Sequence, residues 1–258
     1  QCERSIEFHT QAIDIARAIG NMRFEGIHLG NLGNVYKAQG QHERATRFFT
    51  QAVDIAREIG DKGGEGIDLG NLGDALFALE RLDEAENALR LAIPICDETV
   101  PSAAGAFRGS LALLLSQQAQ LEEAQTLLET GEAQVESYPE EHAKFLAKKG
   151  QVCHLAGDAD GARASLEQAQ ALAADLKVRE DSEVGQAIRE MEGVLGDGIP
   201  GASDKERELA LAKAEQLMEL GKIEHAQGNY DEALRCFTEA LHIFQNHRNR
   251  TGEESVIR

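Results

Sequence analysis

Apolar and small residues recur at steps of three and four along most of the chain, which is the spacing of one face of an α-helix. One such face consists of Leu29, Leu32, Gly33 and Tyr36. The next face consists of Ala45, Phe49, Ala52, Ile55, Ala56 and Ile59. Gly40 and Gly60 follow these segments and are predicted to end the two helices, which we call helix A and helix B. The pattern therefore predicts an antiparallel helix hairpin.

The hairpin is repeated along the chain. Residues 1–34 align without a gap on residues 41–74, and most of the aligned positions are identical. A period of about 40 residues with helical patterning inside each unit predicts a solenoid, in which each unit contacts mainly its neighbours. Gly26, Gly30 and Gly33 recur one period later with helical spacing and no preceding strand, so they are not interpreted as a phosphate-binding loop.

These positions resemble the tetratricopeptide repeat family, whose hairpin has a degenerate pattern of Leu, small, Tyr, small, Phe and Ala. The clearest unit has Leu32, Gly33, Tyr36, Ala45, Phe49 and Ala52. The next has Leu72, Gly73, Leu76, Ala85, Leu89 and Ala92, and the last has Leu220, Gly221, Gly228, Tyr230, Ala233, Phe237 and Ala240. Two weaker units have Leu111, Ala112, Leu115, Ala124 and Leu128, then Gly150, Cys153, Ala162, Leu166 and Ala169. The resemblance implies an all-α fold, a right-handed superhelical solenoid of antiparallel helix hairpins.

The long period resembles a subclass of the family that includes kinesin light chains and the Pins-type spindle-orientation adaptors. The common tetratricopeptide repeat has about 34 residues. Similar arrays occur in bacterial signalling proteins, where the array often follows a kinase, cyclase or ATPase domain. No such domain is visible in this sequence.

The domain organisation is predicted from breaks in the helical pattern. We expect an array over 1–195, made of helix B of a first unit, about four hairpins and a capping helix near 181–195. The run GDGIPGAS predicts a linker over 196–203, and a further hairpin is expected over 204–258. The chain begins in a helix B and ends in TGEESVIR, which aligns with the start of another helix A. We therefore expect a segment of a longer array.

Three prolines refine the predicted helix boundaries. Pro101 and Pro139 lie where two helices A should begin, a place that tolerates proline because first-turn N–H groups lack helical partners. Pro94 lies near the end of the third helix B, which predicts a kink or an early stop there.

Charge limits the classes of partner. The formal net charge is −19 with a pI near 4.8, which argues against nucleic acid and anionic membrane surfaces as partners. The acidity has two interpretations, solubility or a groove selective for basic peptides, and both remain open. The four widely spaced cysteines, no secretory signal in the first residues and no run of about eighteen apolar residues fit a cytoplasmic protein.

Chemistry-bearing residues form no catalytic or metal-binding pattern. The eight histidines show no HxxxH spacing, and no serine has a GxSxG context. Paired acids such as Glu122 and Glu123 lie in predicted first helical turns, where they complement the helix dipole. We therefore predict a protein that is not an enzyme and has no metal and no cofactor.

The resemblance directs attention to the polar residues of helix A, which lines the concave surface in tetratricopeptide superhelices. The predicted partner-binding residues are Asn31, Asn34, Lys37, Asn71, Asp74 and Ser110. Asn31 and Asn71 occupy the positions of an asparagine ladder in the kinesin light chain group, and an amide can both donate to and accept from a ligand backbone. Alternatively, these amides cap local backbone or bond each other between neighbouring helices A.

Two features restrict the predicted site. The ladder positions in later units are Ser110, Lys148 and Glu219, which confines an asparagine ladder to the first units. The lysine and asparagine clamp by which chaperone-binding members hold a C-terminal carboxylate is absent, because the positions around Asn34 and Asp74 lack the basic residues.

These observations predict a scaffold for cytoplasmic signalling or complex assembly that binds a protein or an extended peptide, basic in one interpretation. One alternative is a regulatory segment of a larger signalling enzyme. Another is a self-associating spacer. The sequence predicts no oligomeric state.

Overall fold

The structure, a computed structural model, describes residues 2–179, 181–196, 213, 215–222, 233–238 and 240. The chain divides into two units, Gln1–Asp197 and Gly198–Arg258. Except for Gly196, the predicted linker lies outside the described residues, as does the terminal run TGEESVIR. The predicted domain boundaries therefore remain a prediction.

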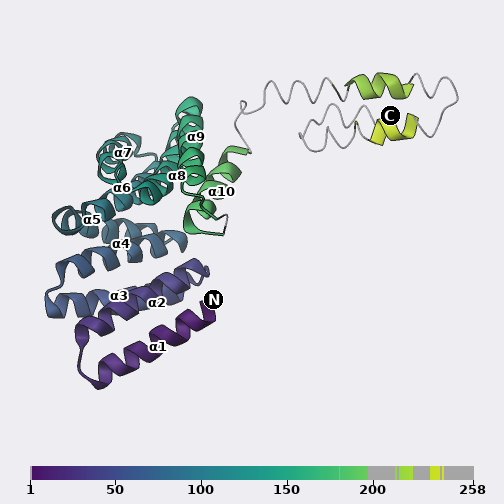
Figure 1. Ribbon diagram of the computed structural model, residues 1–258. Helices are drawn as coiled ribbons and strands as arrows, with labels where there is room; N and C mark the ends of the chain where they lie inside the picture. Colours follow the sequence, from purple (N-terminus) through teal and green to yellow (C-terminus); the bar gives the residue numbers. More distant parts are fainter. Residues whose placement is uncertain are drawn as a thin grey trace. The chain divides into compact units, whose positions relative to one another are not determined.

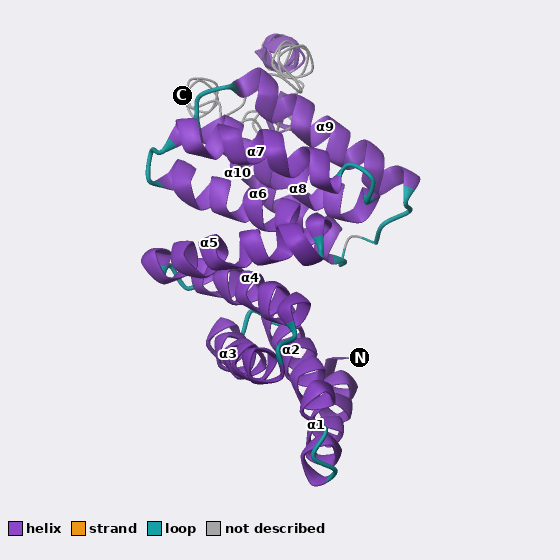
Figure 2. Ribbon diagram, turned by 90° about the vertical axis from the view of Figure 1, so that its left-hand side faces the viewer, coloured by secondary structure: helices purple, strands orange, loops and turns teal. Residues whose placement is uncertain are grey.

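Every described secondary-structure element of the first unit is a helix, joined to the next by a short loop (Figure 2). The helices are α1 (Cys2–Ala18), α2 (Met22–Ala38), α3 (His42–Ile59), α4 (Lys62–Ala78), α5 (Leu82–Thr99), α6 (Pro101–Gln117), α7 (Leu121–Val135), α8 (Pro139–Leu155), α9 (Ala159–Asp175) and α10 (Glu183–Gly196). The all-α prediction is confirmed for this part of the chain.

The helices pack in consecutive antiparallel pairs (Figure 1). The hairpins of helix A and helix B are α2–α3, α4–α5, α6–α7 and α8–α9. The A helices also contact one another in the order α2, α4, α6, α8, and α10 continues this row by packing on α8. The row from α2 to α10 is called the A layer below. A solenoid of helix hairpins is thus confirmed in the first unit.

Glycines lie at the ends of α2 and α3, where the sequence predicts, and Asx side chains cap the starts of α2 and α4. Gly40 and Gly60 adopt φ values of 70° and 72°, in the left-handed region that an L side chain rarely occupies. Asn21 accepts a hydrogen bond from the Phe24 backbone N–H at 3.1 Å, and Asp61 accepts one from Gly64 at 3.0 Å. Local sequence therefore sets these turns without help from distant residues.

A small residue against a large one sets the distance between the two helices of a hairpin. A Cβ on Gly33 would lie 2.6 Å from Cε1 of the fully buried Phe49. A Cβ on Gly73 would similarly lie 2.7 Å from Leu89 Cγ. The two helices approach closely at Gly33 because only glycine leaves room for the facing side chain.

A second seam joins successive A helices. Phe107 of α6 packs on Gly70 of α4. In the following unit a Cβ on Gly109 would lie 2.9 Å from Cδ2 of Phe145 on α8. At the corresponding place in the first interface, a carboxylate, Asp68 of α4, lies on Gly30 of α2. The helical glycines therefore serve helix packing, as their spacing predicts.

Pro101 and Pro139 occupy the first turns of α6 and α8, as predicted. Of the kink or early stop predicted at Pro94, the early stop is wrong, because α5 continues to Thr99. Around this proline, Ile93 and Cys96 are buried in the core. Burial of these apolar side chains stabilises the last turn and offsets the backbone hydrogen bond that proline cannot donate.

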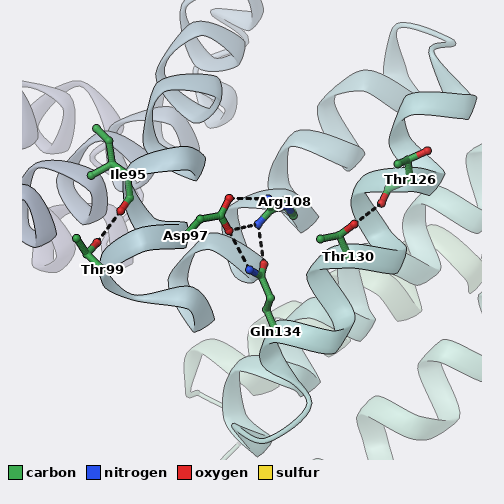
Figure 3. A network of polar contacts seen from close by, with 7 residues as sticks. All are labelled: Ile95, Asp97, Thr99, Arg108, Thr126, Thr130 and Gln134. Atoms are coloured by element: carbon green, nitrogen blue, oxygen red, sulfur yellow. Dashed lines mark hydrogen bonds and ion pairs between the residues drawn. The ribbon is translucent and has the colours of Figure 1, made fainter.

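A polar network ties α5, α6 and α7 together (Figure 3). Both terminal nitrogens of Arg108 donate to the Asp97 carboxylate at 2.7 Å. Arg108 also donates to Gln134 Oε1 at 2.7 Å, and Gln134 Nε2 donates to Asp97 at 2.9 Å. The hydrogen bonds from Arg108 hold the pKa of Asp97 below its ordinary value. Each partner comes from a different helix, so the network fixes their relative positions.

Candidate functional site

The A layer contains a cavity of about 500 Å³ lined by side chains of α2, α4, α6, α8 and α10. We call it the A-layer pocket. Its floor is apolar and consists of Ile67, Ala103, Ala106, Phe107 and Phe145. Its charged residues are Lys37, Asp74, Glu141, Lys144, Lys148 and Glu183. Asn34, Asn71 and Ser102 add neutral polar groups. Nine polar and five apolar residues from five helices thus line a cavity whose volume lies in the range of ligand sites.

Lys37 reaches from α2 to the next A helix. Its Nζ donates to Asn71 Oδ1 on α4 at 3.2 Å. The bond occupies the oxygen of the Asn71 amide, and the two N–H donors of that amide remain at the other end of the group. In this structure the Asn71 amide oxygen is thus held by a lysine of the preceding A helix.

Lys148 reaches in the opposite direction along the A layer. Its Nζ, on α8, donates to Ser110 Oγ on α6 at 2.6 Å. Ser110 is only 2% exposed, and its hydroxyl also lies 3.4 Å from the Ala106 carbonyl oxygen. Ser110 thus lies beneath Lys148 and positions its ammonium group.

Lys144 has carboxylate partners on two helices. Its Nζ lies 2.7 Å from Glu141 Oε1 and 3.3 Å from Glu183 Oε2, which joins α8 to α10. Burial disfavours the charged amine, but the two glutamates outweigh burial and raise the pKa of Lys144. This end of the pocket therefore carries one ammonium and two carboxylates.

The structure brings together four of the six predicted site residues. Asn34, Lys37, Asn71 and Asp74 all line the A-layer pocket. Asn31 is exposed outside the pocket lining, and Ser110 is buried below it. The sequence-based set omitted Lys144 and Glu183, and it treated Lys148 only as a break in the asparagine ladder. Their spacing in the sequence gives no signal, because they meet across helices.

Comparison with known families identifies the repeat. Tetratricopeptide repeat profiles match residues 1–58, 24–98, 145–168 and 214–247, which together exceed half of the chain. The chain is a tetratricopeptide repeat protein. Comparison of its sequence with curated proteins found no match.

Solved tetratricopeptide-like structures share the fold at low sequence identity. BtubC (BKLC) from P. vanneervenii is 18% identical, with a TM-score of 0.53 over 96% of this chain and 93% of that one. The Rap conjugation gene regulator of plasmid pLS20, solved with the Phr* peptide, is 16% identical, with a TM-score of 0.61 over 95% and 70%. A Rap protein complexed with Competence and Sporulation Factor is 15% identical, with a TM-score of 0.57 over 95% and 72%.

One half-buried acid of the repeat array lies outside the pocket. Burial raises the pKa of Asp68 to about 7, with a further contribution from Asp61. Asp68 occupies the place that Phe107 and Phe145 take in later units, against a glycine of the preceding A helix. A signal was present in the sequence, since a charged residue stands where later repeats have phenylalanine.

No described helix is both long and apolar enough to cross a membrane.

Proposed function

We propose that this tetratricopeptide repeat protein is a scaffold that binds an extended segment of a partner protein in the A-layer pocket. The observation that carries the proposal is the pocket itself, in which polar side chains from five successive A-layer helices surround an apolar floor. Such a site offers hydrogen-bonding groups at intervals along its length, which suits an extended backbone better than a compact small molecule.

The Rap structures support this proposal. One was solved with the Phr* peptide and the other with Competence and Sporulation Factor. The likeness to this chain extends over nearly all of its length, although identity is low. A related helical framework can therefore accommodate a peptide ligand, and we extend that mode of binding to this chain.

We assign roles to the predicted site residues on this basis. Asn34, Lys37, Asn71 and Asp74 contact the ligand directly, because all four line the pocket. Asn31 lies one helical turn before Asn34 and contacts a ligand that extends beyond the pocket. Ser110 acts indirectly by holding Lys148.

The proposed setting is cytoplasmic signalling or complex assembly, with binding rather than catalysis as the activity. The described cysteines Cys96, Cys153 and Cys236 are free thiols, which fits a reducing compartment. Burial raises the pKa values of Cys96 and Cys153, so both are poor nucleophiles. Among the charged groups of the pocket, Lys144 pairs with Glu141 and Glu183, whereas Lys37 and Lys148 are bonded to neutral side chains.

Filling the A-layer pocket with a large side chain tests whether the partner binds there. Ala106 lies in the pocket floor, and Ala106→Trp should fill it with an indole ring. Ala133 is exposed on α7, so Ala133→Trp provides a control with the same side chain elsewhere. Peptides selected on the parent protein from a random twelve-residue display library should bind Ala133→Trp normally and lose binding to Ala106→Trp. Equal binding to all three proteins, with unchanged helicity by circular dichroism, would refute the assignment of the pocket.

A further inference from the structure

The ammonium groups of two lysines in the A-layer pocket are each hydrogen-bonded to a neutral side chain. In the described part of the chain, the Nζ atoms of Lys37 and Lys148 are bonded to Asn71 Oδ1 at 3.2 Å and to Ser110 Oγ at 2.6 Å. Neither oxygen is charged. Lys144, in contrast, has Glu141 at 2.7 Å. The ammonium groups of Lys37 and Lys148 are therefore positioned but not neutralised by their partners.

The two ammonium groups converge on neighbouring helices. Lys37 extends from α2 forward onto α4, and Lys148 extends from α8 back onto α6. Helices α4 and α6 contact each other directly in the A layer. The two positive charges therefore lie on adjacent A helices of the pocket.

The other charges of the pocket divide it into two ends. Glu141 and Glu183 are bonded to Lys144 at the α8–α10 end. Asp74 is the carboxylate that α4 contributes to the lining, one turn beyond Asn71. The part of the pocket over α4 and α6 thus holds two ammonium groups against one carboxylate. Its local charge is opposite in sign to the net charge of −19.

We infer that the A-layer pocket selects an acidic peptide segment, with Lys37 and Lys148 each binding one ligand carboxylate. The inference rests on the proposed peptide-binding function and names the ligand class. Alternate side chains of an extended segment point the same way and lie about 7 Å apart, so two acidic side chains can face two adjacent helices. The free N–H donors of Asn71 add to this preference, since they suit carboxylate and carbonyl oxygens.

This inference departs from the basic partner that the net charge favours. Net charge acts at long range and is screened beyond about 8 Å at physiological salt, whereas contact selectivity depends on the groups that line the pocket. A basic segment would place its cations against Lys37 and Lys148, and the repulsion there would be little screened. Asp74 lines the same pocket and repels an acidic ligand. Removing its charge should therefore strengthen binding, whereas removing the lysine charges should weaken it.

The experiment uses the random twelve-residue library and two fluorescein-labelled peptides that differ only in a central Glu-Ala-Glu or Gln-Ala-Gln. Library peptides that bind the parent protein but not Ala106→Trp should be enriched in acidic residues at alternate positions. Lys37→Gln with Lys148→Gln should weaken binding of the Glu-Ala-Glu peptide about tenfold or more. The matching Lys→Arg pair should keep most of the affinity. Asp74→Asn should strengthen binding.

A charge-matched control separates the pocket from the net charge. Arg47 and Lys177 are exposed outside the pocket lining, and changing both to Gln alters the net charge by the same amount. Affinity should then stay within about twofold of the parent. Pocket-dependent peptides that are neutral or basic would overturn the inference and leave the proposed function standing. Peptides that bind the filled pocket equally well would overturn both. Circular dichroism checks that each variant is folded.

Discussion

At the scale of single residues, contacts at glycines decide how closely helices approach. A Cβ on Gly33 would lie 2.6 Å from the Phe49 ring, and Phe49 is fully buried. Gly33→Ala should lower the free energy of unfolding by about 1–3 kcal/mol, because the ring has no space into which to move. Urea unfolding followed by circular dichroism measures the change.

The matched control is Gly193 in α10. Nothing lies within 4 Å of a Cβ built there. Gly193→Ala should raise the free energy of unfolding by about 0.5–1 kcal/mol, because alanine is the better helix former. If both substitutions had the same effect, the seam between α2 and α3 would be misplaced.

Asp68 gives a residue-scale prediction about pH. Its folded-state pKa is raised to about 7 from an ordinary value of 3.8, so between these values the folded protein binds a proton that the unfolded chain lacks. This contribution to stability is fully present below about pH 3.8, is lost progressively as the pH rises from there, and is gone above about pH 7. The stability advantage of Asp68→Asn over the parent should grow with pH up to about pH 7 and be constant above it, so the advantage at pH 8 should exceed that at pH 5 by about 1 kcal/mol or more.

The difference between the two proteins is the measured quantity, because other groups titrate in both. His9, for example, has a pKa lowered by burial and by His28, and its contribution has the opposite sign, with stability lost as the pH falls below 6.5. Thermal unfolding of parent and Asp68→Asn from pH 5 to 8 provides the comparison. A difference that does not change with pH would show that Asp68 stays ionised.

At the scale of helices, the Arg108 network predicts how α5, α6 and α7 hold together. The Arg108 side chain is only 13% exposed, and its bonds reach Asp97 and Gln134. Arg108→Met should lower the free energy of unfolding by about 1–3 kcal/mol, because it leaves a half-buried carboxylate and an amide without their donor. Adding Asp97→Asn should recover part of the loss.

Arg90 supplies the comparison for this network. It bonds Glu86 at 2.8 Å and Glu123 at 2.7 Å, but its side chain is 41% exposed. Exposed ion pairs contribute little, so Arg90→Met should cost less than about 1 kcal/mol. Equal losses at the two arginines in urea titrations would contradict a special role for the network.

At the scale of the whole molecule, net charge and pocket charge should act on different steps of binding. A net charge of −19 repels an acidic peptide at a distance, and salt screens that repulsion. Raising the salt from about 50 to 300 mM should therefore speed association of the Glu-Ala-Glu peptide. Dissociation should also become faster, because the contacts with Lys37 and Lys148 weaken. Stopped-flow fluorescence measures both rates, and slower association at high salt would refute this account.

The sequence by itself determined the helices, their ends and the repeated hairpin. Each of these depends on residues close together in the chain, such as the left-handed Gly40 and Gly60 or the first-turn prolines Pro101 and Pro139. The polar face of helix A was predictable for the same reason, and four of its six predicted site residues line the pocket.

Only the tertiary structure decided which polar groups meet. Lys37 and Asn71 are 34 positions apart, and Lys148 and Ser110 are 38 apart, so each contact depends on how far one A helix is shifted along the next. The burial of Asp68 against Gly30 likewise depends on that shift. At Pro94, packing of Ile93 and Cys96 outweighs a local signal to stop. Periodicity places a side chain on a helix face, but the relative shift of packed helices decides which atoms come within bonding distance.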